Sequence, residues 1–148
     1  ARNINNLFSS DFFDVITCNP PYFNTSNSFF ENDNSIKAIA RHEKYLNLND
    51  IFMVSKKILK TGGRLALVHR TERLIEILNI MKNYGFIAKK IRFIYPKVGK
   101  NSDLMLIECV KGGKAGLKML SPLFVYDEDG NYVDEIKNMF GDDTHDSK

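Results

Sequence analysis

The sequence predicts an α/β fold, in which helices alternate with the strands of a mainly parallel sheet that an antiparallel hairpin closes. The first observation is a short apolar run of β-forming residues, Phe13 to Cys18, which a proline pair stops. The second is a helical pattern followed by a strand over residues 47–68, a unit typical of parallel sheets. The third is a pair of strand patterns, 86–95 and 103–110, whose short connection permits only antiparallel pairing.

The first strand ends in Asn19-Pro20-Pro21-Tyr22. Open α/β sheets bind ligands beyond the carboxyl ends of their strands, so this tetrapeptide lies where a site is expected. Each proline removes a backbone donor, so the stiff turn offers carbonyl oxygens, and the Asn19 side-chain oxygen accepts as well. Tyr22 adds a flat ring. Converging acceptors beside a ring suit a planar amino-bearing group such as adenine, cytosine or a carboxamide.

Length and composition indicate one soluble domain of 148 residues. The two cysteines, Cys18 and Cys109, form neither a disulfide framework nor a metal-ligand spacing, so we expect a reducing cytoplasm and no metal. No membrane span or signal peptide is expected, because the chain lacks a run of 18 apolar residues. Eight Lys or Arg against two acids over 87–118 form a basic patch that is compatible with nucleic acid.

The next elements follow a polar connection over residues 23–46, which is long enough to be functional or disordered. A helix over 47–60 is expected, capped by an asparagine and ended by Gly62-Gly63. The buried parallel strand 64–68 then places His69 and Arg70 at the same sheet edge as Asn19. These two residues are candidates for an RNA or substrate contact.

A second helix is expected over 71–84, with Thr71 as its cap and Gly85 as its stop. Its buried face is predicted to hold Leu74, Ile75, Leu78 and Met81. The hairpin that follows carries cations that can neutralise phosphates, and its second strand is expected at the sheet edge. These cations are Lys89, Lys90, Arg92, Lys97 and Lys100.

Four segments together resemble one family. They are 14–23 with the Asn-Pro-Pro-Tyr motif, 40–43, 62–70 and 90–97, and the resemblance covers most of residues 12–126. The chain resembles the bacterial tRNA (adenine-N6)-methyltransferases that act on a valine tRNA. The resemblance implies a tRNA substrate, S-adenosylmethionine as cofactor, and the carboxyl-terminal half of a Rossmann-like class I methyltransferase sheet.

The resemblance also implies roles for individual residues. Asn19, Pro20, Pro21 and Tyr22 would be catalytic, with Asn19 also touching the cofactor. Arg41, His42 and Glu43 would position RNA, although they also suit local salt links at a helix entry. The full set of expected substrate contacts is Phe23, Arg41, His42, Glu43, His69, Arg70, Lys97 and Lys100.

No glycine occurs before Gly62, so the glycine-rich cofactor loop of this family is expected outside the chain. Residues 1–12 then form the remnant of an amino-terminal half, 13–126 the carboxyl-terminal half, and 127–148 an acidic tail. The remaining half is expected on the same polypeptide or on a partner chain, unless the gene itself is truncated. Two alternatives stay open: a protein-glutamine methyltransferase, which shares the motif, and an inactive module that binds RNA or a partner. Titration with the cofactor separates the inactive module from the enzyme.

Overall fold

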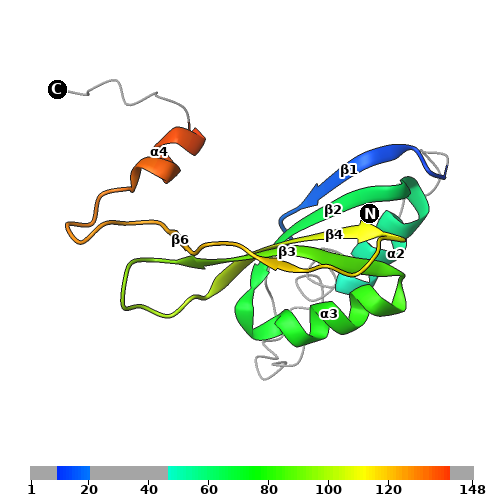
Figure 1. The fold of residues 1–148 in the computed structure, drawn as a ribbon, viewed down its shortest axis with the longest axis horizontal. Helices are drawn as coiled ribbons and strands as arrows, with labels where there is room; N and C mark the ends of the chain where they lie inside the picture. The colour runs from blue at the N-terminus through cyan, green and yellow to red at the C-terminus, as the bar shows by residue number, and fades with distance from the viewer. Residues whose placement is uncertain (1–9, 21–46, 141–148) are drawn as a thin grey trace, which may run out of the picture.

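The computed structural model describes residues 10–20 and 47–140 of the chain (Figure 1). The described elements run in the order β1 Phe13–Cys18, α2 Leu48–Ile58, β2 Leu59–Arg70, η2 Thr71–Arg73, α3 Leu74–Asn83, β3 Phe86–Tyr95, β4 Leu104–Lys111, β5 Lys118–Met119, β6 Leu123–Phe124 and α4 Asp134–Phe140. The predicted α/β class is confirmed.

The sheet has the strand order β1-β2-β4-β3-β5, with β6 also paired to β3. β1 pairs with β2 in parallel, while β4 lies antiparallel to both β2 and β3. The expected antiparallel hairpin is therefore present, but its second strand is inserted within the sheet and does not form the edge. Because β4 reverses direction between β2 and β3, the carboxyl ends of β1, β2 and β3 all reach one edge of the sheet. We call this the carboxyl edge.

Helices α2 and α3 pack on one face of the sheet (Figure 1). Their apolar side chains and alternate residues of the strands form one core. Its fully buried members include Phe52, Leu65, Ile77, Phe86, Met105 and Ile107. Within the described residues no helix covers the opposite face, which Val68 and Leu106 share with charged side chains.

Helix α2 begins as predicted, because the Asn47 side chain caps it by accepting a hydrogen bond from Asn49 N–H at 3.1 Å. It ends earlier than predicted, at Ile58. The glycine pair lies inside β2, in an irregular stretch where the register against β1 shifts. A Cβ on Gly63 would stand 2.8 Å from the Lys60 carbonyl oxygen, so the close approach of backbone explains this glycine.

Helix α3 differs from the prediction at its start and on its buried face. The Thr71 hydroxyl caps no helix and donates instead to the Ser102 carbonyl oxygen at 2.7 Å. Ile75 is 68% exposed, and Ile77, Ile80 and Met81 are buried. The predicted stop at Gly85 is confirmed, with a φ of +78°.

The chain after β4, residues 112–140, forms an arm. It contains β5 and β6, which pair with β3, and then α4. Figure 1 shows α4 beyond the carboxyl end of β3, away from α2 and α3. The arm is fixed to β3 by Arg92, whose guanidinium donates to both carboxylate oxygens of Glu135 at 2.5 and 2.8 Å. Arg92 also donates to the Ser121 carbonyl oxygen at 2.9 Å. No helix in the described part of the chain is long and apolar enough to cross a membrane.

Candidate functional site

Asn19 and Pro20 directly follow β1 at the carboxyl edge. The last pair of the parallel register joins Cys18 to Leu67, so Asn19 and Pro20 come next to the final residues of β2. Asn19 is exposed and Pro20 is buried. The buried proline thus fixes the end of this segment and leaves the Asn19 side chain at the surface. Pro21, Tyr22, Phe23, Arg41, His42 and Glu43, six of the predicted site residues, lie outside the described residues.

His69 lies at the end of β2 on the face covered by the helices, and its side chain is only 1% exposed. Its Nδ1 accepts a hydrogen bond from Arg70 N–H at 2.9 Å, so the proton of the neutral ring belongs on Nε2. Burial lowers the pKa of His69, and the charge of Arg73 lowers it further. The ring is therefore neutral at neutral pH, and its burial favours a positioning role. Arg70 is exposed at the same edge.

The turn between β3 and β4, residues 96–103, is fixed to the end of β2. Thr71 N–H donates to the Asp103 carbonyl oxygen at 3.1 Å, beside the hydroxyl contact to Ser102. The turn carries Lys97 and Lys100, both exposed. Across the described residues neither ammonium has a hydrogen bond or an ion pair. The carboxyl edge therefore carries Asn19, then Arg70, and then two cations available to an anion.

The other predicted cations of β3 are engaged within the molecule. Lys90 forms an ion pair with Glu108 at 3.1 Å, and Arg92 holds Glu135. The Lys89 ammonium donates to the Lys114 carbonyl oxygen. Lys111 forms an ion pair with Asp11 at 2.8 Å. Among the described residues, the cations of the predicted basic patch without a side-chain partner are therefore Lys97, Lys100, Lys114 and Lys118, and of these only Lys97 and Lys100 lie at the carboxyl edge. Charge counts along a sequence cannot distinguish paired from unpaired cations.

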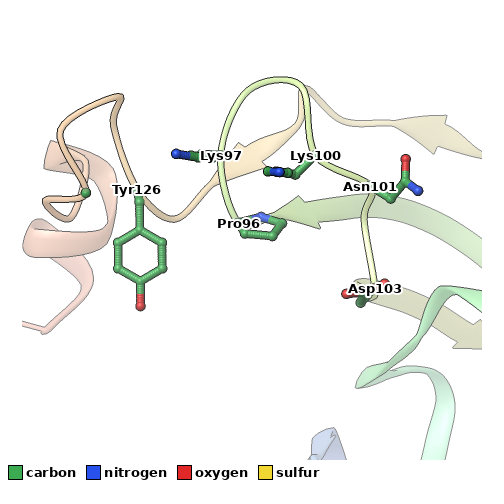
Figure 2. A pocket seen from close by; sticks show the side chains of 7 residues that line it. Pro96, Lys97, Lys100, Asn101, Asp103 and Tyr126 are labelled. Carbon is green, nitrogen blue, oxygen red and sulfur yellow. The ribbon is translucent and has the colours of Figure 1, made fainter.

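A cavity of about 590 Å³ opens beside this turn (Figure 2). Pro96, Lys97, Lys100, Asn101, Asp103, Tyr126 and Gly130 line it. Sequence reasoning missed Tyr126, because nothing in the local pattern shows that residues 126 and 96 meet. Tyr126 N–H donates to the Pro96 carbonyl oxygen at 2.8 Å, and this contact brings the arm to the turn.

A second hollow, of about 420 Å³, lies on the uncovered face of the sheet with Asn19 at its end. Ala66, Val68, Leu106 and Leu120 give it an apolar floor, and Lys90, Arg92 and Glu108 contribute charge. Its chemistry is that of a packing surface more than of a reaction site. In the described part of the chain no three His, Cys, Asp or Glu side chains gather as metal ligands.

Both cysteines are free thiols among the described residues. Cys109 is fully buried, and its Sγ donates to the Leu65 carbonyl oxygen at 3.5 Å. Burial raises the pKa of Cys109 to about 12 and also raises the pKa of Cys18. Neither thiol is a nucleophile at neutral pH.

Solved structures with a similar fold include methyltransferases. A predicted O-methyltransferase from Agrobacterium tumefaciens superposes with a TM-score of 0.69 at 20% identity, over 93% of this chain and 55% of that one. A putative DNA modification methylase from Thermus thermophilus gives 0.52 at 16% identity, over 76% of this chain and 52% of that one. The mixed sheet with an inserted antiparallel strand is thus a methyltransferase sheet in fold.

Among curated proteins, the chain is similar to proteins named tRNA1(Val) (adenine(37)-N6)-methyltransferase. The Aeromonas hydrophila protein is 29% identical over 122 residues, which are 82% of this chain and 50% of that protein. The Porphyromonas gingivalis W83 protein is 27% identical over 106 residues, 72% of this chain and 40% of that protein. No family model matches the chain. The chain spans about half the length of the curated relatives that it matches.

Proposed function

We propose that this chain is the substrate-binding part of an S-adenosylmethionine-dependent methyltransferase that modifies the exocyclic amine of an adenine in tRNA. The observation that carries the proposal is the placement of Asn19-Pro20 directly after β1, on the edge shared with the ends of β2 and β3. The relatives named as tRNA adenine methyltransferases support the same assignment. A cytoplasmic location follows from a tRNA substrate.

In the proposed mechanism Asn19 and Pro20 act on the amine. The Asn19 side-chain oxygen and the Pro20 carbonyl oxygen accept its two N–H groups. This arrangement favours a pyramidal nitrogen and directs its lone pair away from the ring, toward the methyl group. Tyr22 would stack on the extruded base. When bound, S-adenosylmethionine would supply the methyl group as an electrophile, its sulfur–methyl bond breaking as the new N–C bond forms. The methylated amine would then give up one proton to water.

The described residues fit the substrate side of such a site and only the margin of a cofactor site. Asn19 is exposed at the edge and can contact both the amine and the methyl donor. We therefore propose that the cofactor is held mainly by a polypeptide segment that this chain does not contain. The relatives, about twice as long as the matched region, have room for such a segment.

The apolar hollow on the uncovered sheet face also supports the proposal that a further polypeptide segment completes the site. Strands that are buried on one face only are unusual in a mainly parallel sheet, because helices normally cover both faces. We propose that the remaining half packs over Ala66, Val68 and Leu106, in the same polypeptide or in a partner chain. Asn19 at the end of this hollow would then face the cofactor.

The test is Asn19→Ala in the protein extended by the remaining half. Turnover on tRNA should fall far more than tRNA affinity, because the Asn19 contact strengthens as the amine pyramidalises. Loss of a comparable polar contact in an oxyanion hole costs about 10²- to 10³-fold in rate, which sets the outer scale. Methylation with radiolabelled cofactor and filter binding of tRNA measure the two quantities.

Asn101→Ala is the matched control, since Asn101 lies in the turn and not beside Pro20. In Asn101→Ala, the rate of turnover should fall by no larger a factor than the affinity for tRNA. Unchanged turnover in Asn19→Ala would remove Asn19 from the mechanism. Methylation of a glutamine peptide in place of tRNA would favour the hypothesis of a protein-glutamine methyltransferase.

A further inference from the structure

We propose that the cavity between the 96–103 turn and the arm is a subsite for a nucleotide of the RNA that flanks the methylated adenine. Its base would stack on Tyr126 and its phosphate would bind Lys97 and Lys100. This inference rests on the proposed RNA substrate but concerns a site separate from Asn19. The cavity volume of about 590 Å³ lies within the range of small-ligand pockets, about 300–1,000 Å³.

Tyr126 is presented as a rigid platform. Tyr132 stacks on it with ring centroids 5.1 Å apart and an interplanar angle of 23°. The two residues also form an antiparallel β-bridge, and Val125 N–H donates to the Tyr95 carbonyl oxygen at 2.9 Å. Tyr126 remains 37% exposed and lines the cavity. A ring held in place stacks a base at little further cost in conformational entropy.

Tyr126 is uncharged at neutral pH, as an ordinary tyrosine is, and its hydrogen bond with Tyr132 raises its pKa further. A phenolate beside a phosphate backbone would repel it. Phe140 lies 6.2 Å from Tyr132, centroid to centroid, and is 75% exposed. The arm thus presents a row of three rings, of which Tyr126 is the one that meets the cavity.

The charges around the cavity determine where a phosphate can lie. Figure 2 shows Lys97 and Lys100 on the turn above the cavity, with Tyr126 and Asp103 at opposite sides. The arm hairpin carries Asp127, Glu128 and Asp129, which repel anions. A phosphate is therefore accepted on the lysine side alone, which orients a nucleotide with its base toward Tyr126. The Asp103 carboxylate is placed to accept a hydrogen bond from an amino group of the base or a ribose hydroxyl.

The position of the cavity also suits a flanking nucleotide. β1, β2 and β3 all end at the carboxyl edge, and the contacts of Thr71 join the turn to the end of β2. An RNA strand that presents its adenine at Asn19 could cross Arg70 and reach the turn. Unpaired bases on aromatic side chains are the usual mode of single-stranded RNA recognition.

The test uses the 148-residue chain and a fluorescein-labelled single-stranded RNA decamer, with affinity measured by anisotropy. Tyr126→Leu keeps apolar volume but loses the ring face, and it should weaken binding about 5- to 100-fold. Tyr126→Phe should bind within about twofold of the native chain, because the ring face remains. Neither change should alter the slope of log affinity against log salt.

The double variant Lys97→Gln with Lys100→Gln should flatten that slope by about 1.4, the value for two phosphates of a single strand. Lys56→Gln is the control. Lys56 lies in the last turn of α2, just before β2 begins and far from the carboxyl edge, so the change should leave affinity and slope unchanged. Hydrogen exchange of amides in Asp134–Phe140 shows whether the arm of each variant stays folded. The lysine variants provide the test even if Tyr126→Leu unfolds the arm.

The subsite is overturned if folded Tyr126→Leu binds the decamer like the native chain, or if the lysine pair behaves like Lys56→Gln. It is also overturned if an acidic peptide of equal charge binds with the same dependence on Tyr126, which would assign the cavity to a protein. Each of these results leaves methylation at Asn19 intact. Absence of adenine methylation by the extended protein would instead remove the proposed function and leave RNA binding by the chain unaffected.

Discussion

The imidazole of His69 accepts a hydrogen bond from the Arg70 N–H, so its orientation is coupled to the backbone that leaves β2. The ring packs on the same face as Leu67 and Met105 and is nearly inaccessible to solvent. A catalytic base must reach the proton that it removes, and a buried ring with a lowered pKa is poorly suited to that work. The geometry favours His69 as a residue that sets the direction of Arg70 at the carboxyl edge.

The stability of the fold should consequently depend on pH between about 5 and 7. The unfolded chain takes up a proton at His69 near pH 6.5, whereas the folded chain holds the ring neutral to lower pH. Stability from this residue is complete above pH 6.5 and is lost as the pH falls below it. The melting temperature should therefore decrease on acidification from pH 7 to 5.

His69→Asn should flatten that dependence, because Asn retains an acceptor for Arg70 N–H and does not titrate. Asn101→Ala, an exposed change in the turn that removes no titratable group, is the control and should keep the native slope. The carboxyls of Glu76 and Glu135, whose pKa values their arginine partners lower, titrate below this window. An equal slope in native and His69→Asn chains, measured by circular dichroism, would contradict the pKa direction.

At the scale of single residues, the sequence identified those whose role follows from local chemistry. Asn19 and Pro20 follow a strand as expected, and Asn47 caps α2. Thr71 and Tyr126 could not be predicted, because their partners, Ser102 and Pro96, lie 31 and 30 residues away in sequence. Such contacts are set by the packing of the sheet and leave no periodic signal.

Among the elements, the arm that follows β4 is the least dependent on the core. Only Ile136 of α4 is buried, and the arm is held to β3 mainly by strand pairing and by Arg92. The Arg92 side chain is only 15% exposed and makes a bidentate pair, whose two fixed bonds orient the helix. Because the same arm carries Tyr126, a shift of α4 would also move Tyr126 relative to the cavity.

We predict that Arg92→Lys will loosen α4 while leaving the sheet intact. A lysine cannot form the bidentate pair with Glu135 or reach the Ser121 carbonyl oxygen at the same time. Hydrogen exchange of amides in Asp134–Phe140 should accelerate, and exchange in β2 and β4 should not change. Lys137→Gln, which removes only the exposed ion pair to Asp134 at 3.3 Å, is the control. Unchanged exchange in α4 would show that Ile136 and strand pairing suffice.

The types of the main elements were predictable from periodicity, but their ends and their order in the sheet were not. The pattern of β2 is that of a buried strand, yet the glycine pair alone predicts a helix stop as readily as a strand irregularity, because glycine is typical of both roles. The hairpin of β3 and β4 was predictable from its short connection. The insertion of β4 between β2 and β3 was not, because it depends on pairing between distant strands.

In the molecule as a whole, one face of the sheet is packed and the other is covered by no helix among the described residues. The sequence resemblance led to the expectation of half a methyltransferase sheet, and the relatives are about twice as long as the matched region. The uncovered face has an apolar floor of Val68, Leu106 and their neighbours, and a covering half would bury it. The two faces should therefore respond differently to a polar substitution.

We expect Leu106→Gln to be tolerated by the chain alone, at a cost below about 1 kcal/mol, because the amide stays in contact with water. In the protein extended by the remaining half, the same amide would be buried without a partner and should cost about 1–3 kcal/mol. Ile107→Gln, on the packed face at 2% exposure, is the control and should destabilise both forms. Urea unfolding of the two variants and the unsubstituted protein, each in both forms, measures these differences. If Leu106→Gln costs the extended protein no more than it costs the chain alone, the remaining half does not pack on this face, and the placement of Asn19 toward the cofactor loses its support.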